Sequence, residues 1–329
     1  MNRLPIKILL FLLLSLFVGL SLFFGACKTT EPAAGPPGLQ GKADRYEELI
    51  RSPEKGHLTI YFLDLSVSPQ AEDKSGDAML LILPDGLVMM VDSGHPESAA
   101  DSLALLSELG IARIDYFFIT HPHIDHIGGF PAIAEKYEIG EVFQTDIEYI
   151  TETYRLYKKV IETHRIPVRS LKRGDTLLLG EEITAQVFNP PDEIKYPQNF
   201  PANSTQFIND NSMVVKLSWG KSDILLGGDI YLTRERDISE LYGEELHAIV
   251  SKANHHGNDS SNGAWWIRTV QPELVVAMDD KISSMTVYNN FKKSGAVYYH
   301  TSLDGLVRVT LNREGEYSVV SRFDSWLRD

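Results

Sequence analysis

The sequence of 329 residues contains only one cysteine, Cys27. A single thiol cannot form a disulfide within the chain, so the small disulfide-stapled scaffolds of many secreted proteins are excluded. The stability of the chain must come from a hydrophobic core, and the sequence is long enough to build a large one.

Basic residues are outnumbered by acidic ones. There are 31 lysines and arginines against 45 aspartates and glutamates, which gives a formal net charge of −14 at pH 7. Loss of residues 1–26, which contain Arg3 and Lys7 but no acid, would change the net charge to −16. Because such a body repels polyanions, it holds nucleic acid poorly as a whole, and any such substrate must be bound locally.

Long apolar runs are absent except at the N-terminus. Arg3 and Lys7 precede an almost entirely apolar run from Ile8 to Phe24, and small residues then lead into Cys27. This order is typical of a bacterial lipoprotein signal peptide over residues 1–26, with membrane lipid attached at Cys27. An uncleaved anchor is the alternative, since the run is near the minimum of about 17 apolar residues needed to span a membrane. Either arrangement predicts a protein of the cell envelope that faces outward from the cytoplasmic membrane, in the periplasm or at the outer membrane.

The composition then changes to proline, glycine, alanine and charged residues. Pro36-Pro37-Gly38 cannot continue a helix or a strand, so residues 27–56 are predicted to be a flexible tether. Asp44 to Arg51 has the pattern of one short helix within it. Residues 57–329 remain, and they are expected to form one large domain.

Four potential metal ligands lie close together at the end of a predicted strand. His121 and His123 are two residues apart, so an extended backbone directs both imidazoles to the same side. Asp125 and His126 follow after a turn and can be directed at a second point nearby. Imidazole and carboxylate groups suit zinc, manganese or iron rather than calcium, so this stretch predicts a metal site.

The periodicity of apolar residues predicts both strands and helices. Strands are expected at residues 58–66, 77–83, 87–92, 114–119, 141–144, 182–188, 212–218, 223–227, 296–300, 305–311 and 317–320, and helices at residues 99–109, 151–164, 288–293 and from about residue 130. Strand clusters interleaved with helices favour an α/β fold in which two mixed sheets pack face to face with helices outside.

Several segments together resemble the metallo-β-lactamase fold superfamily. The pattern H-x-H-x-D-H-x-G-G at residues 121–129 resembles its signature, and residues 91–94, 226–229 and 253–257 resemble its Asp-x-Gly turn, its Gly-Asp strand end and its late histidine motif. The sequence is most similar to the extracellular hydrolase domain of ComEC-like DNA-uptake proteins, which share His-His-Gly and a closing Thr-x-x-Asp-Gly, here residues 301–305. The resemblance covers residues 58–320 and implies an αββα sandwich with metals along one edge.

The resemblance also implies a two-metal site. Its ligands would be His121, His123, Asp125, His126, Asp229 and His256. His121 and His123 would hold the first ion, and Asp125, His126 and a late histidine the second, with Asp229 bridging both. One or two divalent ions are therefore expected, with zinc favoured and manganese as the alternative.

The late histidine remains open between two neighbours. His256 directly precedes glycine and is favoured as the ligand, which leaves His255 as the leaving-group acid or as a partner of a ligand. A metal-bound hydroxide would attack the substrate, with Asp125 and His255 as the catalytic residues. Asp92 is expected to orient a ligand histidine rather than to bind metal.

This chain also departs from its relatives. The superfamily's usual third histidine of the first metal is missing, and Asn211 lies in the corresponding region as a candidate substrate contact. Residues 66–77 form a longer polar loop than the short Gly-Gln-Gly-Asp turn of relatives, and at the mouth of the site it would change substrate access. His300, near the closing motif, is a second candidate substrate contact.

A basic stretch bears on the substrate. Residues 155–173 contain seven basic residues and one acid, including Lys158 and Lys159 as candidate substrate contacts. The stretch is either a solvated helix face or a basic rim that guides a phosphate-bearing substrate.

Three classes of function remain open. A metal-dependent hydrolase acting on phosphodiesters, including nucleic acid, is favoured by the resemblance. An amide or ester hydrolase of the lactamase or lactonase type is the first alternative, and a non-catalytic surface-binding lipoprotein is the second. No stable protein partner is expected.

Replacement of Cys27 by serine tests the predicted anchor. Cys27→Ser should abolish lipid attachment and either release the protein from the membrane fraction or leave an uncleaved precursor, because the thiol is the acceptor. Palmitate labelling and the apparent mass of the chain measure both effects. Unchanged labelling and mass in the variant would show that Cys27 is not modified.

Overall fold

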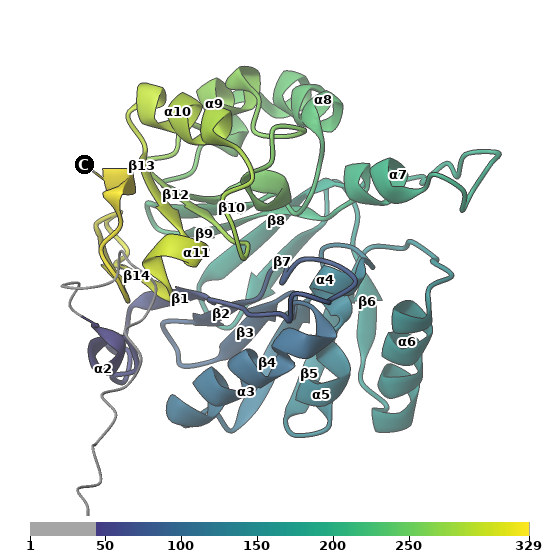
Figure 1. The fold of residues 1–329 in the computed structure, drawn as a ribbon, viewed down its shortest axis with the longest axis horizontal. Helices are drawn as coiled ribbons and strands as arrows, with labels where there is room; N and C mark the ends of the chain where they lie inside the picture. Colours follow the sequence, from purple (N-terminus) through teal and green to yellow (C-terminus); the bar gives the residue numbers. More distant parts are fainter. Residues whose placement is uncertain (1–43, 329) are drawn as a thin grey trace, which may run out of the picture. The chain divides into compact units, whose positions relative to one another are not determined.

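In the computed structural model, which describes residues 44–328, two mixed β-sheets form the centre of the domain (Figure 1). The strands of the first sheet, in spatial order, are β15 (Tyr317–Ser321), β14 (Val307–Leu311), β1 (Leu58–Phe62), β2 (Met79–Ile82), β3 (Val88–Val91), β4 (Arg113–Phe118), β5 (Glu138–Gln144) and β6 (Val168–Ser170). Those of the second are β13 (Val297–His300), β12 (Leu274–Ala277), β11 (Val250–Lys252), β10 (Ser222–Leu226), β9 (Val214–Trp219), β8 (Ile183–Asn189) and β7 (Thr176–Leu179).

The central strands are apolar on both faces because each sheet is covered on both sides. In β1, Leu58, Ile60 and Phe62 belong to the core between the two sheets. Tyr61, on the opposite face of the same strand, belongs to the core between the first sheet and its helices. Burial on both faces explains why these strands read as continuous apolar runs rather than as alternating ones.

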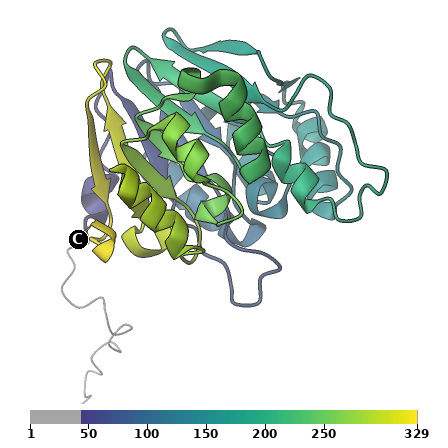
Figure 2. The same ribbon diagram turned by 90° about the horizontal axis from the view of Figure 1, so that it is seen from above.

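Helices form the two outer layers, as Figures 1 and 2 show. The first sheet is covered by α3 (Ala99–Glu108), α4 (Ile124–Ile127), α5 (Phe130–Ala134) and α6 (Glu152–His164), and the second by α8 (Leu232–Tyr242), α9 (Ala264–Val270) and α10 (Met285–Ser294). Shorter elements are α2 (Tyr46–Leu49), α7 (Thr205–Asp210), α11 (Thr301–Asp304) and the 3-10 turns Pro96–Ser98, Gly243–Leu246, Asn254–Gly257 and Trp326–Arg328. The predicted αββα sandwich is therefore confirmed.

Parallel strands position the site. β3, β4, β5 and β6 run parallel in the first sheet, and β10, β11, β12 and β13 run parallel in the second. Asp92 and Thr120 follow β3 and β4, while Gly227 and Ala253 follow β10 and β11. The carboxyl ends of parallel strands are where α/β folds bind ligands, and here those of both sheets supply the loops of one site.

The predicted tether is too long at its C-terminal end. Leu49 of α2 is fully buried in the core beneath the first sheet. Arg45 donates hydrogen bonds to Ser321 O at 2.9 Å and to both carboxylate oxygens of Asp324 at 2.8 Å. Residues 44–50 therefore belong to the domain, which begins earlier than residue 57. Residues 27–43 of the predicted tether, including Cys27, and the signal peptide lie outside the described residues.

Several elements were not predicted from the sequence. They are β6, β7, β11, β12, α7, α8, α9 and the single turns α4 and α11. Within residues 44–328, no helix has both the length and the apolar character needed to cross a membrane.

Replacement of Leu49 tests the docking of α2. Leu49→Ala should lower the free energy of unfolding by about 2–5 kcal/mol, because it leaves a cavity in a packed core. Glu47→Ala, at an exposed position of the same helix, is the matched control and should change it little. Chemical denaturation measures both, and equal values for the two variants would contradict the docking.

Candidate metal centre

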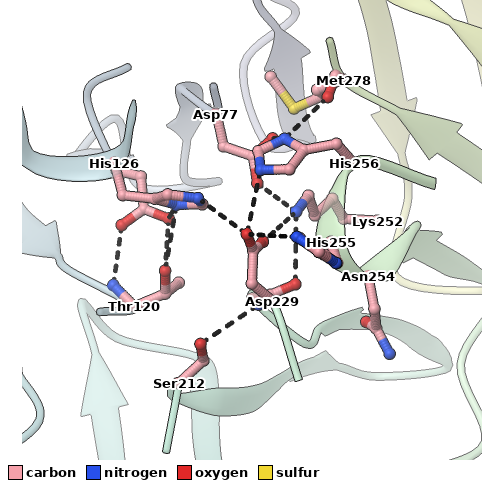
Figure 3. Close-up of polar contacts among 12 residues, drawn as sticks. Asp77, Thr120, His126, Ser212, Asp229, Lys252, Asn254, His255, His256 and Met278 are labelled. Atoms are coloured by element: carbon pink, nitrogen blue, oxygen red, sulfur yellow. Dashed lines mark hydrogen bonds and ion pairs between the residues drawn. The ribbon is translucent and has the colours of Figure 1, made fainter. Parts of the chain in front are cut away.

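Loops from both sheets bring their carboxylates and imidazoles to one buried place (Figure 3). The loop after β4 contributes His121 and His123 and continues into α4, which carries Asp125 and His126. The sequence analysis expected these last two residues to follow a turn, and the structure places them within one turn of helix. Asp229 follows β10 from the second sheet. The predicted ligands are thus brought together.

Four donor atoms surround one point. His256 Nε2 lies 3.1 Å from Asp229 Oδ2 and 3.2 Å from Asp125 Oδ2. His126 Nε2 lies 3.3 Å from Asp229 Oδ2 and 3.6 Å from Asp125 Oδ2. Ligands of a tetrahedral zinc ion at 2.0–2.1 Å are separated from one another by about 3.3 Å. The spacing of these four donors therefore fits a divalent metal ion.

The charge at this point also favours a cation. Asp125 Oδ2 and His126 Nε2 are buried and have no hydrogen-bond partner among the described residues. Burial lowers the pKa of His126, but Asp229, Asp125 and Asp92 outweigh it and raise the pKa to about 10. Without a metal ion, the carboxylates thus draw a proton onto the imidazole of His126. A divalent ion bound at this point would displace that proton.

Each of the two ligand histidines is oriented through its other ring nitrogen. His126 Nδ1 lies 2.8 Å from Asp92 Oδ2, and Asp92 in turn accepts hydrogen bonds from Thr120 N at 2.8 Å and Thr120 Oγ1 at 2.6 Å. His256 Nδ1 lies 3.1 Å from Asp77 Oδ1 and 3.0 Å from Met278 O. Such partners fix the tautomer and turn Nε2 toward the metal, so Asp92 lies where the sequence predicted an orienting residue.

Asp77 is the residue of the site that sequence reasoning missed. It belongs to a group of four whose donor atoms all lie within 4.8 Å of one another, namely Asp77, His126, Asp229 and His256. Because Asp77 contacts the Nδ1 side of His256, we assign it the role of orienting that ring. The available signal was Gly76-Asp77, which ends the long loop with the last two residues of the relatives' Gly-Gln-Gly-Asp turn.

A fully buried lysine lies beside Asp229, the predicted bridging carboxylate. Lys252 forms an ion pair with Asp77, and its Nζ lies 3.5 Å from Asp229 Oδ1 and 3.4 Å from Gly228 O. Burial lowers the pKa of Lys252, but Asp77 and Asp229 outweigh it and raise the pKa above its usual value. The charged ammonium group therefore lies on the Oδ1 side of Asp229, while Oδ2 lies beside Nε2 of His126 and His256.

The predicted first metal position has fewer donors. His121 Nε2 lies 3.0 Å from His123 Nδ1 and 3.9 Å from Asp229 Oδ2. Burial lowers the pKa of both histidines, so both are neutral and have a lone pair to offer. His255 Nε2 lies 4.0 Å from the same Asp229 oxygen, and burial lowers the pKa of His255 to about 4. A neutral His255 is suited to coordinate a metal, whereas the predicted role of leaving-group acid would require a protonated ring.

The two late histidines lie on a strained turn. His255 has φ +46° and His256 has φ +55°, which is the left-handed region that side chains disfavour. Glu235 holds the turn because its carboxylate accepts hydrogen bonds from Asn254 Nδ2 at 2.7 Å and Gly263 N at 2.8 Å. Strain of this kind is retained where surrounding contacts enforce it, most often at functional sites.

A cavity of about 410 Å³ opens beside His255 and His256. Its other walls are residues 67–74 of the long polar loop and residues 279–283 after β12. The loop therefore borders the cavity beside the site, as the sequence analysis anticipated.

The predicted substrate contacts are less closely tied to the site. Asn211 donates from Nδ2 to Phe207 O of its own helix at 2.8 Å. His300 is buried, and its Nδ1 accepts from Ser302 N at 3.2 Å, which caps α11. Burial lowers the pKa of His300 to about 4, and its Nε2 has no hydrogen-bond partner among the described residues.

The basic stretch is largely neutralised by nearby acids. Lys158 pairs with Glu148 at 2.9 Å, and Lys172 pairs with Asp192 at 3.4 Å. Two further pairs are Arg155–Glu152 at 3.0 Å and Arg169–Glu141 at 3.6 Å. Lys159 is exposed on α6. These ion pairs favour the interpretation of a solvated helix face over that of a basic rim.

Part of this site lies in a segment that matches a known protein family. Residues 72–191 match the metallo-beta-lactamase superfamily, a range that contains Asp77 and the 121–126 cluster. ComE operon protein 3 of Bacillus subtilis is 23% identical over 244 residues, covering 70% of this chain and 29% of that protein. Competence protein ComA of Neisseria gonorrhoeae is 22% identical over 233 residues, covering 69% of this chain and 30% of that protein. Exodeoxyribonuclease YycJ of Bacillus anthracis is 32% identical over 77 residues, covering 23% of this chain and 29% of that protein. This chain thus spans less than a third of the length of each relative.

Substitution of Asp77 and Asp229 tests the assignment of the centre. Asp229→Asn should remove most bound metal, because Oδ2 of Asp229 is one of the donors. Asp77→Asn should lower metal affinity by about tenfold to a hundredfold, since it acts through the orientation of His256. Chelator competition and elemental analysis measure both effects, with the exposed Asp85→Asn as the control. A folded Asp77→Asn protein with unchanged affinity would refute the orienting role.

Proposed function

We propose that this chain, of which residues 72–191 match the metallo-beta-lactamase superfamily, is a metal-dependent hydrolase that acts on phosphodiesters. The observation that carries the proposal is the set of four buried donors, two carboxylates and two imidazoles, spaced 3.1–3.6 Å apart around one point. Their nitrogen and oxygen chemistry favours zinc, with manganese as the alternative.

The charge of the site supports an anionic substrate. Its carboxylates and ammonium groups are Asp77, Asp92, Asp125, Asp229, Lys74 and Lys252. With neutral histidines these groups carry a net charge of −2, which one divalent ion would cancel and two would convert to +2. A site with excess positive charge attracts a phosphodiester more strongly than a neutral amide.

A bound divalent ion would supply a nucleophile by lowering the pKa of a water molecule to about 7 and would offset charge on the substrate oxygen. The residues of the chain prepare that chemistry. Asp92 and Asp77 keep Nε2 of His126 and His256 directed inward. Lys252 lies 3.5 Å from Oδ1 of Asp229 and compensates part of the buried negative charge. His255, neutral at pH 7, can accept a proton or coordinate beside Asp229.

The names of the relatives agree with this substrate class. Two of them are competence proteins by name or operon, and a third is named as an exodeoxyribonuclease. Their similarity supports a role at the cell envelope, and we include lipid attachment at Cys27 in the proposal. The acidic body of the chain favours small phosphodiesters, or strand ends, over long polyanions.

A substrate panel with the full chain tests the proposal. Bis-p-nitrophenyl phosphate should be hydrolysed in the presence of zinc or manganese, single-stranded DNA more slowly and nitrocefin not at all. His121→Ala should lower kcat by about a hundredfold or more, because it removes a donor at the reacting centre. The exposed His164→Ala is the matched control and should leave kcat unchanged.

The opposite pattern would reject the phosphodiesterase. Efficient turnover of nitrocefin or a lactone, with no hydrolysis of phosphodiesters under any of zinc, manganese or iron, would identify an amide or ester hydrolase. Absence of turnover with every substrate in metal-loaded protein would instead support a binding lipoprotein.

A further inference from the structure

The polar loop of residues 66–76 is held at both ends against the metal centre. At its start, Ser66 donates from N and from Oγ to Asp101 Oδ2, each at 2.8 Å. At its end, His95 N donates to Ser75 O at 3.0 Å, and Asp77 N donates to Asp125 O at 3.1 Å. The loop is therefore positioned by the same segments that hold the metal ligands.

This loop places one cation at the edge of the metal centre. Lys74 Nζ lies 3.4 Å from Asp125 Oδ2, and 25% of the side chain is exposed. Lys74 also lines the cavity beside His255 and His256.

The ammonium group has capacity for a ligand. An ammonium carries three N–H donors, and the contact with Asp125 uses one of them. Asp125 is also a donor to the metal centre, so a bound ion would share its negative charge. The remaining donors of Lys74 then face a cavity that also contains His255.

The other charged groups of the cavity limit what can enter. Asp73, Asp279 and Asp280 line it together with Lys74 and Lys281. These carboxylates would repel a further phosphate group of a substrate whose first phosphate contacts Lys74. The loop closes one side of the cavity. The surroundings therefore suit a substrate with one anionic group, either a small molecule or the end of a strand.

We propose that Lys74 is a substrate-binding residue that donates to a non-bridging oxygen of one phosphodiester group, and that its loop selects small phosphodiesters or strand ends. This inference rests on the proposed function. Lys74 belongs to the long polar loop, where this sequence departs from the short Gly-Gln-Gly-Asp turn that the resemblance leads us to expect.

Substitution of Lys74 in the metal-loaded full chain tests the inference. Lys74→Gln should raise KM for bis-p-nitrophenyl phosphate by about tenfold to a hundredfold, with a smaller change in kcat and unchanged metal content by elemental analysis. Lys74→Arg should restore most of the affinity. The exposed Lys136→Gln is the matched control and should behave as the wild type.

Binding of inorganic phosphate, measured by calorimetry, separates this inference from the proposed function. Lys74→Gln should weaken phosphate binding by a similar factor, whether or not the wild type hydrolyses phosphodiesters. Unchanged phosphate affinity, or a loss of bound metal that matches the loss of activity, would overturn the role of Lys74 and indicate a residue that only anchors the loop. Absence of phosphodiester hydrolysis by the wild type would count against the proposed function alone.

Discussion

Negative charge buried where the two sheets meet is the constraint on which the site depends. Asp77, Asp92, Asp125 and Asp229 are each at most 2% exposed. When one partner of a buried ion pair is removed, the free energy of unfolding falls by about 3–5 kcal/mol, because the charge of the remaining partner is left uncompensated. Lys252, the hydrogen bonds to Asp92 and the expected metal each offset part of this charge. A bound divalent ion would therefore be a structural component as well as a chemical one, because the loops that carry its ligands would share its stabilisation.

The sequence was sufficient to predict most of the fold and the ligand cluster. His121 and His123 are two residues apart, so their common direction follows from backbone geometry, and Asp125 and His126 follow within three residues. Asp229 and His256 were identified by resemblance, and the structure brings both to the same point. Strands such as β1 and β4 were predicted because their apolar runs are long enough to cross a sheet that is covered on both faces.

The remaining features depend on contacts between residues that are distant in sequence. In the sequence, Asp77 is a single acidic residue that precedes a strand. Only the folded structure shows that it contacts Nδ1 of His256. The docking of α2 rests on Arg45 and Asp324, which are 279 residues apart in the chain. Helix α8 has polar residues on most positions, so its apolar periodicity is weak. The basic stretch looked unpaired because its acids, such as Asp192, are contributed by other segments.

The loop before Asp77 has fixed ends and an exposed middle. Gly76 has φ +77°, and a Cβ atom there would lie 1.7 Å from Asp125 O, so no other residue fits at that end. Residues 68–70 are exposed to solvent and can vary without disturbing the core. Selection can therefore lengthen, shorten or recompose the middle of this loop while the ligand geometry stays constant. In evolutionary terms, the chain separates the part that determines which molecule enters from the part that performs the reaction.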